Sequence, residues 1–463
     1  MVIATFSFAL VLGGESIAER TFTLFAQDPL TLYSGSRGGQ LSYTFGELLQ
    51  KYPLGAGLGR WGMRILNAQD ALHSEGGVES YLAAIVPALH ARGHAIAMLF
   101  VRRGSRTPLA DSIDGPCVGI DPDHQDSAFD EVKTWGPDIC FSNNMAPLEI
   151  ERALLDEWPV VKFMHGYFGT CISALKMHEF PSGVACTRTL GPACLALYGP
   201  RHCGALNPSA LVNGYRWARS QQQLLPRYQT IVVASEHMVD EYVRHGAPRE
   251  RLAMLPLFPS LPLAAPGTES SNSVLFLGRM TMLKGGDILV RAVARATADL
   301  GRPVRLIMGG DGPQRNEWQR LARRERVAAE FPGWLDSRQR LSALADAAML
   351  AVPSVWPEPF GLVGLEAAAR GVPAVAFDTG GIRQWLRHDV SGLLVPPGGG
   401  FRAMATALTT ILDDRALRDR LSRGAIATAT AMSLDAHADA LERVLMNASR
   451  ASLASVPALA GRS

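Results

Sequence analysis

The residues best suited to chemistry lie in one stretch of the chain's second half, SVWPEPFGLVGLEAAARGVPAVAFDTGG, residues 354–381. An apolar strand ends just before it, and a helix is predicted to begin near Gly361. Strand-to-helix turns leave backbone N–H groups unpaired, and the helix dipole adds partial positive charge at the same place. We therefore expect a diphosphate to be bound by the N–H groups of Gly361, Leu362 and Val363.

Two glutamates flank this turn. Glu366 lies one turn inside the predicted helix, where a carboxylate cannot attract an anion but can accept hydrogen bonds from vicinal hydroxyls such as those of a ribose. Glu358 precedes the helix and could hold hydroxyls of a sugar. The spacing therefore predicts a site for a nucleoside diphosphate that carries a sugar.

Two cations follow an earlier strand, in FLGRMTMLKGG. Arg279 and Lys284 suit a diphosphate whose negative charge grows as it leaves. Lysine is scarce in this chain, and Lys284 is the only one after Lys176. Taken singly, each charge could be an ordinary solvated loop residue. Their shared place at the carboxyl ends of strands, where parallel sheets bind ligands, favours a site.

Strands and helices alternate around these residues, which is typical of a doubly wound domain. A Pro-, Ser- and Gly-rich linker at 259–272 precedes this second domain, which is predicted to span 273–430. An amphipathic helix is expected at 431–447 and a disordered Ala/Ser-rich tail at 448–463. Strands are predicted at 273–278, 304–310, 329–334, 349–354 and 372–378, and helices at 285–301, 314–326, 341–347 and 361–371.

A first domain of the same kind is predicted at 63–258. It begins with the strand MRILNA and the helix VESYLAAIVPALHARG, which stops at Gly93. His165 ends a later strand and would face the cleft between the domains. Ser235 and Glu236 follow another strand end and are lesser candidates for lining that cleft. Further strands are predicted at 94–101, 138–143, 160–165 and 230–235, a helix at 237–247, and a closing segment at 252–258.

Residues 1–62 differ from the rest: they are glycine-rich and lack a strand–helix rhythm. Their sequence YPLGAGLGRWG resembles part of a periplasmic loop of O-antigen polymerases and ligases. One interpretation is a fused or mis-started upstream segment, with Met63 as the natural beginning. The other is an N-terminal extension that packs on the first domain.

The motifs together resemble the retaining glycosyltransferases of family 4. Seven residues separate Glu358 and Glu366 in EPFGLVGLE, and the Gly-Arg…Lys element is present as Gly278, Arg279 and Lys284. The stretches Gly309–Pro313 and 331–334 also fit, and the resemblance covers about residues 63–447. It implies a GT-B fold: an α/β protein in which two Rossmann-like domains face a central cleft.

The resemblance also implies an activity and further site residues. It implies transfer of a hexose-type sugar from a nucleotide diphosphate donor to an acceptor hydroxyl, with retention at the anomeric carbon. The base would lie near Trp334 and Leu335, and His165 would position the transferred sugar. Gly77, in SEGGVES, matches a loop of the same family that approaches a phosphate or an acceptor. No cofactor is implied, because Arg279, Lys284 and helix amides can bind the diphosphate.

Four cysteines lie in an irregular insertion at 166–215: Cys171, Cys186, Cys194 and Cys203. Their spacing lacks the short pairs of most zinc sites. Three alternatives stay open: four unrelated thiols, a structural zinc site, or redox-labile pairs. The insertion lies where an acceptor would enter, so it could shape acceptor choice.

Composition limits the partners. A net charge of +2 over 463 residues argues against a dedicated nucleic-acid binder. No apolar run reaches the length of a membrane span, and the N-terminus lacks the features of a secretory signal, so a cytoplasmic protein is expected. Arginines gathered at 201–251 form either a solvated face or a surface for anionic lipid at the inner face of the cell membrane, where a glycan or lipid-linked acceptor would be found.

Two rival functions share the fold. A sugar-nucleotide-binding module would bind the donor without turnover, which the intact Glu358, Arg279 and Lys284 argue against. An epimerase or a phosphorylase would use different chemistry. A phosphorylase needs a lysine for its pyridoxal cofactor, and Lys284, the only lysine of the second domain, is already assigned to the donor.

Overall fold

The computed structural model divides the chain into two compact units, Met1–Trp61 and Gly62–Ser463. In the larger unit it describes residues 62–72, 77–103, 112–120, 125–181, 183–204, 207–264 and 272–455. In the smaller unit it describes the backbone of six short strands. These form three antiparallel pairs: β1 (Ile3–Phe8) with β4 (Arg20–Phe25), β2 (Val11–Leu12) with β3 (Glu15–Ser16), and β5 (Thr31–Ser34) with β6 (Leu41–Thr44). Most of the polymerase-like sequence at 52–62 lies outside the described residues.

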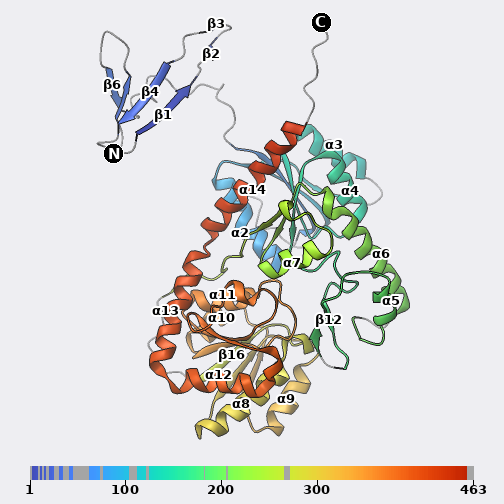
Figure 1. Ribbon diagram of the computed structural model, residues 1–463, viewed down its shortest axis with the longest axis vertical. Helices are drawn as coiled ribbons and strands as arrows, with labels where there is room; N and C mark the ends of the chain where they lie inside the picture. Colours follow the sequence, from blue (N-terminus) through green and yellow to red (C-terminus); the bar gives the residue numbers. More distant parts are fainter. Residues whose placement is uncertain are drawn as a thin grey trace. The chain divides into compact units, whose positions relative to one another are not determined.

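The first domain is built on a seven-stranded parallel sheet of order β15-β14-β11-β10-β7-β8-β9 (Figure 1). Successive side chains of a strand face opposite sides, so Ile65 packs against helix α2 while Leu66 joins the core under α3 and α4. Both faces are covered, as expected for parallel strands rich in apolar residues. The strands are β7 (Arg64–Leu72), β8 (Ala95–Arg103), β9 (Cys117–Gly119), β10 (Ile139–Asn143), β11 (Val160–Met164), β14 (Thr230–Val233) and β15 (Leu252–Met254). The helices are α2 (Gly77–Ala91), α3 (Gln125–Trp135), α4 (Leu148–Glu157), α6 (Pro208–Leu224) and α7 (Glu236–Arg244).

The second domain has a six-stranded parallel sheet of order β18-β17-β16-β19-β20-β21. Its strands are β16 (Ser273–Leu277), β17 (Arg305–Gly309), β18 (Ala328–Gly333), β19 (Met349–Val352), β20 (Ala374–Phe377) and β21 (Gly392–Val395). Its helices are α8 (Gly286–Leu300), α9 (Arg315–Arg324), α10 (Ser337–Ala345), α11 (Leu362–Ala369) and α12 (Gly400–Asp413). Each predicted strand and helix of this domain is present within a few residues. The fold is therefore the predicted one, with two Rossmann-like α/β domains.

After α13 (Arg415–Ala431), the last described helix, α14 (Leu434–Ser455), returns to the first domain. In Figure 1 the red helix α14 runs beside α2, and the two helices are in contact. A helical stripe of Ala438, Leu441, Leu445 and Ala448 joins the core of the first domain. The predicted disorder from residue 448 is therefore wrong as far as Ser455, because this buried stripe extends the helix. Residues 456–463 lie outside the described part.

Two other local predictions need correction. The strand β7 continues to Leu72, beyond the predicted strand MRILNA at 63–68, because Gln69, Ala71 and Leu72 also pair with β8. The insertion is not wholly irregular: it contains the strand pair β12 (Met177–His178) and β13 (Val184–Ala185) and the short helix α5 (Ala193–Leu197). In the described part of the chain, no helix is long and apolar enough to cross a membrane.

Candidate active site

The turn into α11 is the centre of the candidate site. Gly361 precedes the helix in the left-handed conformation, with φ of 84°. A side chain there would also meet Ile382 Cδ1 at 2.7 Å from its Cβ. Only glycine fits both conditions, so the chain turns sharply and α11 begins at Leu362. The first N–H groups of a helix have no partner within it, and those of Leu362 and Val363 begin α11.

Glu358 and Lys284 meet just before this turn. The Lys284 ammonium donates to Glu358 Oε1 at 2.6 Å, and the glutamate side chain is buried. Lys284 Nζ also lies 5.0 Å from the centre of the Trp356 ring, within range of a cation–π contact. The predicted cation and the predicted carboxylate therefore form one unit, which the sequence could not show.

Arg279 lies in the same β16–α8 loop as Lys284, but it is exposed. Its side chain has no ion pair among the described residues. An unpaired guanidinium at the carboxyl end of β16 keeps its charge available for a phosphate. The two cations thus differ: a carboxylate holds Lys284, whereas Arg279 is open to solvent.

Glu366, the predicted ribose contact, lies inside α11 and is buried. Its carboxylate accepts hydrogen bonds from Arg340 Nη1, with Oε2 at 3.2 Å, and from the Ser260 hydroxyl. Arg340 belongs to α10 and Ser260 to the linker. Neither partner was predicted from the sequence. Both contacts fix the direction in which the carboxylate points.

Trp334 and Leu335 follow β18, as predicted for the region of the base. Trp334 is 77% exposed, which is unusual for so large an apolar side chain. Leu335 lies against Gly309 at the end of β17. An exposed indole beside a small-residue loop offers a stacking surface for an aromatic base.

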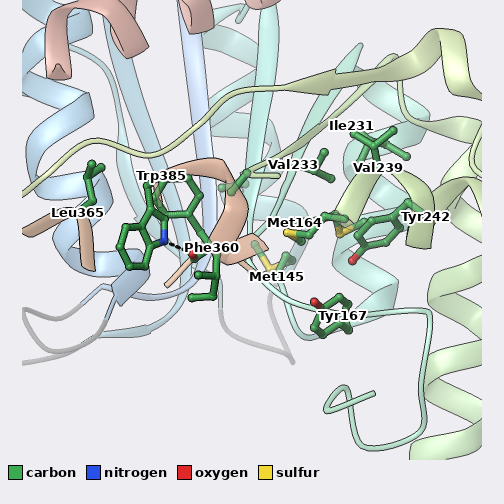
Figure 2. Close-up of a cluster of buried hydrophobic side chains, with 14 of the residues drawn as sticks. Met145, Met164, Tyr167, Ile231, Val233, Val239, Tyr242, Phe360, Leu365 and Trp385 are labelled. Atoms are coloured by element: carbon green, nitrogen blue, oxygen red, sulfur yellow. Dashed lines mark hydrogen bonds between the residues drawn. The ribbon is translucent and has the colours of Figure 1, made fainter. Parts of the chain in front are cut away.

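The loop that carries Glu358 is held by the first domain. The Tyr167 hydroxyl donates to Pro357 O and the Ser235 hydroxyl to Pro359 O, both at 2.6 Å. The Trp356 indole donates to Leu175 O at 2.6 Å. Figure 2 shows Phe360 and Trp385 of the second domain in one apolar cluster with Met145, Met164 and Tyr167 of the first. Ser235, predicted to line the cleft, therefore positions this loop.

His165 follows β11 and is partly buried. Burial, aided by the positive charge of Lys162 and by His437, lowers its pKa from 6.5 to about 3, so the ring is neutral at physiological pH. Asn143 Nδ2 donates to Asn67 Oδ1 at 3.1 Å, so Asn143 Oδ1 is the atom that faces His165 Nε2, at 2.9 Å. The proton then lies on Nε2, and Nδ1 can accept a hydrogen bond from a substrate hydroxyl.

The remaining predicted residues lie in the first domain. Gly77 begins α2 and is exposed, while Gly76 lies outside the described residues. The backbone N–H of Glu236 donates to Gln384 Oε1 of the second domain at 3.2 Å. Gly77 is therefore available to a ligand, and Glu236 is one of the contacts between the two domains.

The four cysteines are unpaired in the insertion. Among the described residues, no three His, Cys, Asp or Glu side chains are arranged to hold a metal ion. Cys203 Sγ instead lies 3.4 Å from His178 Nδ1, and Cys194 Sγ lies 3.7 Å from Thr189 O. Burial, and after it the other three thiols, raise the pKa of Cys203 to about 11, so the four side chains lie near enough to interact and the zinc alternative stays untested.

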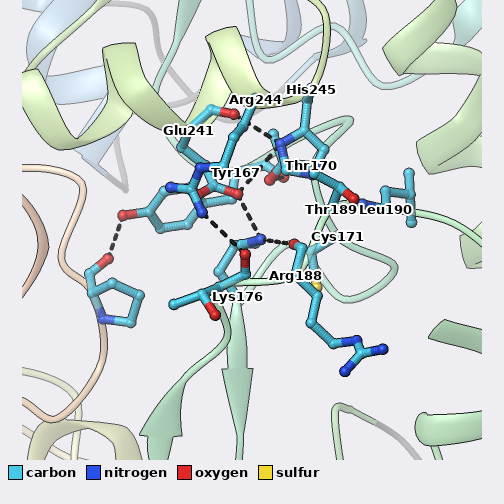
Figure 3. A network of polar contacts seen from close by, with 12 residues as sticks. Tyr167, Thr170, Cys171, Lys176, Arg188, Thr189, Leu190, Glu241, Arg244 and His245 are labelled. Atoms are coloured by element: carbon cyan, nitrogen blue, oxygen red, sulfur yellow. Dashed lines mark hydrogen bonds and ion pairs between the residues drawn. The ribbon is translucent and has the colours of Figure 1, made fainter. Parts of the chain in front are cut away.

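What holds the insertion is a buried ion pair that the sequence analysis missed. Lys176 Nζ lies 2.5 Å from Glu241 Oε1, and the same ammonium donates to Arg188 O (Figure 3). Arg244 binds the other oxygen of Glu241 at 2.7 Å. The rarity of lysine was the only signal that could have pointed to Lys176.

The fold and these residues define a two-domain nucleotide-sugar protein. The family description "Glycosyl transferase 4-like domain" matches residues 76–257, and "Glycosyl transferases group 1" matches residues 265–428. Together the two matches cover most of the chain and adjoin at the linker. The chain therefore belongs to the group 1 glycosyltransferases of GT-B fold.

Individual relatives agree. A D-inositol 3-phosphate glycosyltransferase of Xylanimonas cellulosilytica is 33% identical over 258 residues, 48% of this chain and 60% of the relative. An alpha-D-kanosaminyltransferase of Streptomyces kanamyceticus is 32% identical over 163 residues, 34% and 41% of the two chains. The chain thus spans about half the length of these curated relatives.

Solved structures share the fold. The Anabaena protein HepE in complex with UDP superposes with a TM-score of 0.62 at 19% identity, covering 83% of this chain and all of that one. WaaG, a glycosyltransferase involved in lipopolysaccharide biosynthesis, gives a TM-score of 0.58 at 16% identity, covering 82% and 99%. These similarities establish the GT-B architecture.

Proposed function

We propose that this chain is a retaining glycosyltransferase that moves a hexose-type sugar from a nucleotide diphosphate donor to an acceptor hydroxyl. The observation that carries the proposal is the ion pair of Lys284 and Glu358 beside the N-terminus of α11. It places a cation, a carboxylate and helix N–H groups at one strand end, which is what a sugar diphosphate requires.

Each group has a distinct part in the reaction. Lys284, Arg279 and the N–H groups of Leu362 and Val363 would bind the diphosphate and stabilise the charge that it gains as the glycosidic bond breaks. Glu366 would accept from the ribose hydroxyls, and Trp334 with Leu335 would contact the base.

Glu358 and His165 would orient the transferred sugar. A neutral His165 could accept at Nδ1 from a sugar hydroxyl without placing a positive charge beside the reacting carbon. No metal is needed for donor binding, because cations and helix N–H groups of the chain supply the charge. The printed names of relatives and neighbours, which include UDP complexes and glycosyltransferases, support this donor class.

The experiment is a donor panel with a matched inactive variant. UDP- and GDP-sugars are incubated with the protein, with and without candidate acceptors, and the products are identified by mass spectrometry. We expect one donor to be consumed, and Glu358→Gln to abolish transfer while UDP still binds. Donor binding without hydrolysis or transfer, for every pair tried, would favour the non-catalytic binding module.

We further propose that the acceptor is a glycan or a lipid-linked glycan at the inner face of the cell membrane, in surface polysaccharide or lipid-linked oligosaccharide assembly. Arginines at 201–251 would supply attraction to anionic lipid. Several are already paired, such as Arg227 with Asp156 at 2.6 Å, so the attraction should be modest. Sedimentation with anionic and neutral vesicles tests this, and equal sedimentation with both would contradict it.

A further inference from the structure

The first domain contains a cavity of about 270 Å³ that is lined by none of the residues assigned above to the donor's diphosphate, ribose or base. It lies at the carboxyl-terminal part of β7 and just after β10, where α2 and α6 close it. Its volume is roughly nine times the ~30 Å³ share of one water molecule in the liquid, enough for a single small ring. Two lining residues connect the cavity to His165. Lys162 belongs to β11, the strand that His165 follows, and Asn144 is the neighbour of Asn143, which binds the imidazole.

The cavity wall contains three carboxamides whose oxygens have no hydrogen-bond partner among the residues that the structure describes. These are Gln69 and Gln221, which are 4% and 2% exposed, and Asn144. A buried polar atom without a partner costs about 1–3 kcal/mol, so three around one cavity need an explanation. Asn144 also has a φ of 31°, in the left-handed region that is uncommon outside glycine.

These oxygens are covered by neighbouring atoms in the present arrangement. The terminal torsion of a Gln or Asn side chain is broad and soft, so a small rotation brings the oxygen to the cavity. There it can accept from a ligand hydroxyl while the amide N–H groups donate to another. A carboxamide matches a hydroxyl-rich ligand, because hydroxyls both donate and accept.

The charge of the cavity decides what kind of hydroxyl-rich ligand fits. Lys162 is the only cation among the described lining residues, and it is neutralised by the buried Glu151 at 3.0 Å. Ser142 joins the pair by donating to Glu151 and accepting from Lys162. Asp70 and Glu79 also line the cavity, and each has an interaction of its own. A phosphate would therefore meet no unpaired cation among the described lining residues.

An aromatic wall completes the cavity. Phe168 and Trp217 meet edge to face, with ring centres 5.6 Å apart. The Trp217 indole donates to Ala146 O at 3.0 Å, which fixes the ring. The apolar C–H face of a sugar ring suits such a wall, while its hydroxyl edge would face Gln69 and Gln221.

We propose that this cavity binds the acceptor, and that the group it takes is an uncharged polyhydroxylated ring, a sugar or cyclitol without a phosphate. The inference rests on the proposed glycosyl transfer and names the substrate class of its acceptor side. It separates this chain from a relative whose printed name specifies an inositol phosphate.

The test is saturation-transfer NMR on the full chain in the presence of UDP. The uncharged probes are myo-inositol and methyl α-D-glucopyranoside, and the charged ones are inositol 3-phosphate and glucose 6-phosphate. We expect saturation transfer to the uncharged probes and at least tenfold weaker binding of their phosphates. Gln221→Leu should weaken binding of the uncharged probes about tenfold, because one hydrogen bond is lost. Gln223→Leu, on the exposed side of the same helix, should leave their binding unchanged.

The outcomes separate this inference from the proposed function. Tighter binding of the phosphates, equal behaviour of Gln221→Leu and Gln223→Leu, or no saturation transfer to either uncharged probe would overturn the acceptor inference. Donor hydrolysis is measured on the same samples. If the wild-type chain hydrolyses a donor but fails the probe test, only the acceptor inference is wrong, whereas failure to hydrolyse any donor counts against the proposed function.

Discussion

Replacing Lys284 by methionine should have two separable effects, one on turnover and one on stability. The ammonium lies 2.6 Å from Glu358 Oε1 and would stabilise the leaving diphosphate. Removal of one such group typically costs a factor of about 10²–10³ in turnover. The variant also leaves the Glu358 carboxylate, whose side chain is 7% exposed, without its counter-ion.

The stability loss can be bounded from the same geometry. Breaking a fully buried pair costs about 3–5 kcal/mol, because one charge stays buried and unpaired. Lys284 is 27% exposed, so we discount the loss for solvent screening to about 2–3 kcal/mol. The double variant Lys284→Met with Glu358→Gln removes both charges and should recover most of this stability, but none of the turnover.

The assay combines denaturant unfolding with donor turnover for the two single variants and the double variant. Arg279→Met is the matched control: its exposed side chain has no ion pair in the described part of the chain, so turnover should fall about 10²-fold without loss of stability. If Lys284→Met keeps near wild-type turnover, Lys284 does not act on the diphosphate. If the double variant is as unstable as the single one, the ion pair is not what stabilises the loop.

Three further predictions concern the nucleotide, pH and the N-terminal unit. Glu366→Ala should weaken UDP binding in calorimetry, whereas Glu358→Ala should leave UDP binding nearly unchanged and lower the rate of transfer. The opposite pattern would mean that Glu358 contacts the ribose and Glu366 the transferred sugar. Burial lowers the pKa of His437 from 6.5 to about 4, so the folded protein should be fully stable, as far as this group is concerned, above pH 6.5. As the pH falls to 4, the free energy of unfolding should drop by up to about 3 kcal/mol. In His437→Gln the free energy of unfolding should depend less on pH, and parallel curves for the two proteins would refute this. A chain that begins at Met63 should express, melt within a few degrees of the full chain and turn over donor at the same rate, because MRILNA already supplies the first strand of the sheet. Aggregation, or a larger drop in melting temperature, would show that residues 1–62 stabilise the first domain.

The fold was predictable because its signals are local. Short apolar strands followed by helices mark most of the repeating units, and some of the helices stop at a glycine, as does the helix at 285–301 that follows the strand at 273–278. The site was predictable in composition for a related reason: the carboxyl ends of parallel strands lie on one edge, so Arg279, Lys284 and Glu358 had to be near one another.

What the sequence could not supply are contacts between distant segments. Nothing local in Ser260 or Arg340 marks them as partners of Glu366, and nothing in Lys176 marks its pairing with Glu241. The end of α14 was missed because the Ala/Ser-rich segment after residue 447 has weak apolar periodicity. This segment is buried by contacts with the first domain, and the sequence of the segment alone does not show those contacts.

The cavity of the first domain was missed for the same reason. Gln69, Asn144 and Gln221 come from three separate elements and are ordinary residues in sequence. Only their convergence on one space distinguishes them, with three oxygens that lack partners in the described part of the chain. A group of residues that meet only in the folded chain is visible in the structure but not in a sequence motif.

The most direct test of the central claim is the anomeric configuration of the product. The donor that the panel identifies is used with an acceptor, and the new glycosidic bond is assigned by proton NMR from the coupling of its anomeric proton during the first turnovers. The account predicts that an α-configured nucleotide sugar gives an α-linked product, and that Glu358→Gln gives none. A β-linked product, or an unchanged donor with every acceptor, would contradict it.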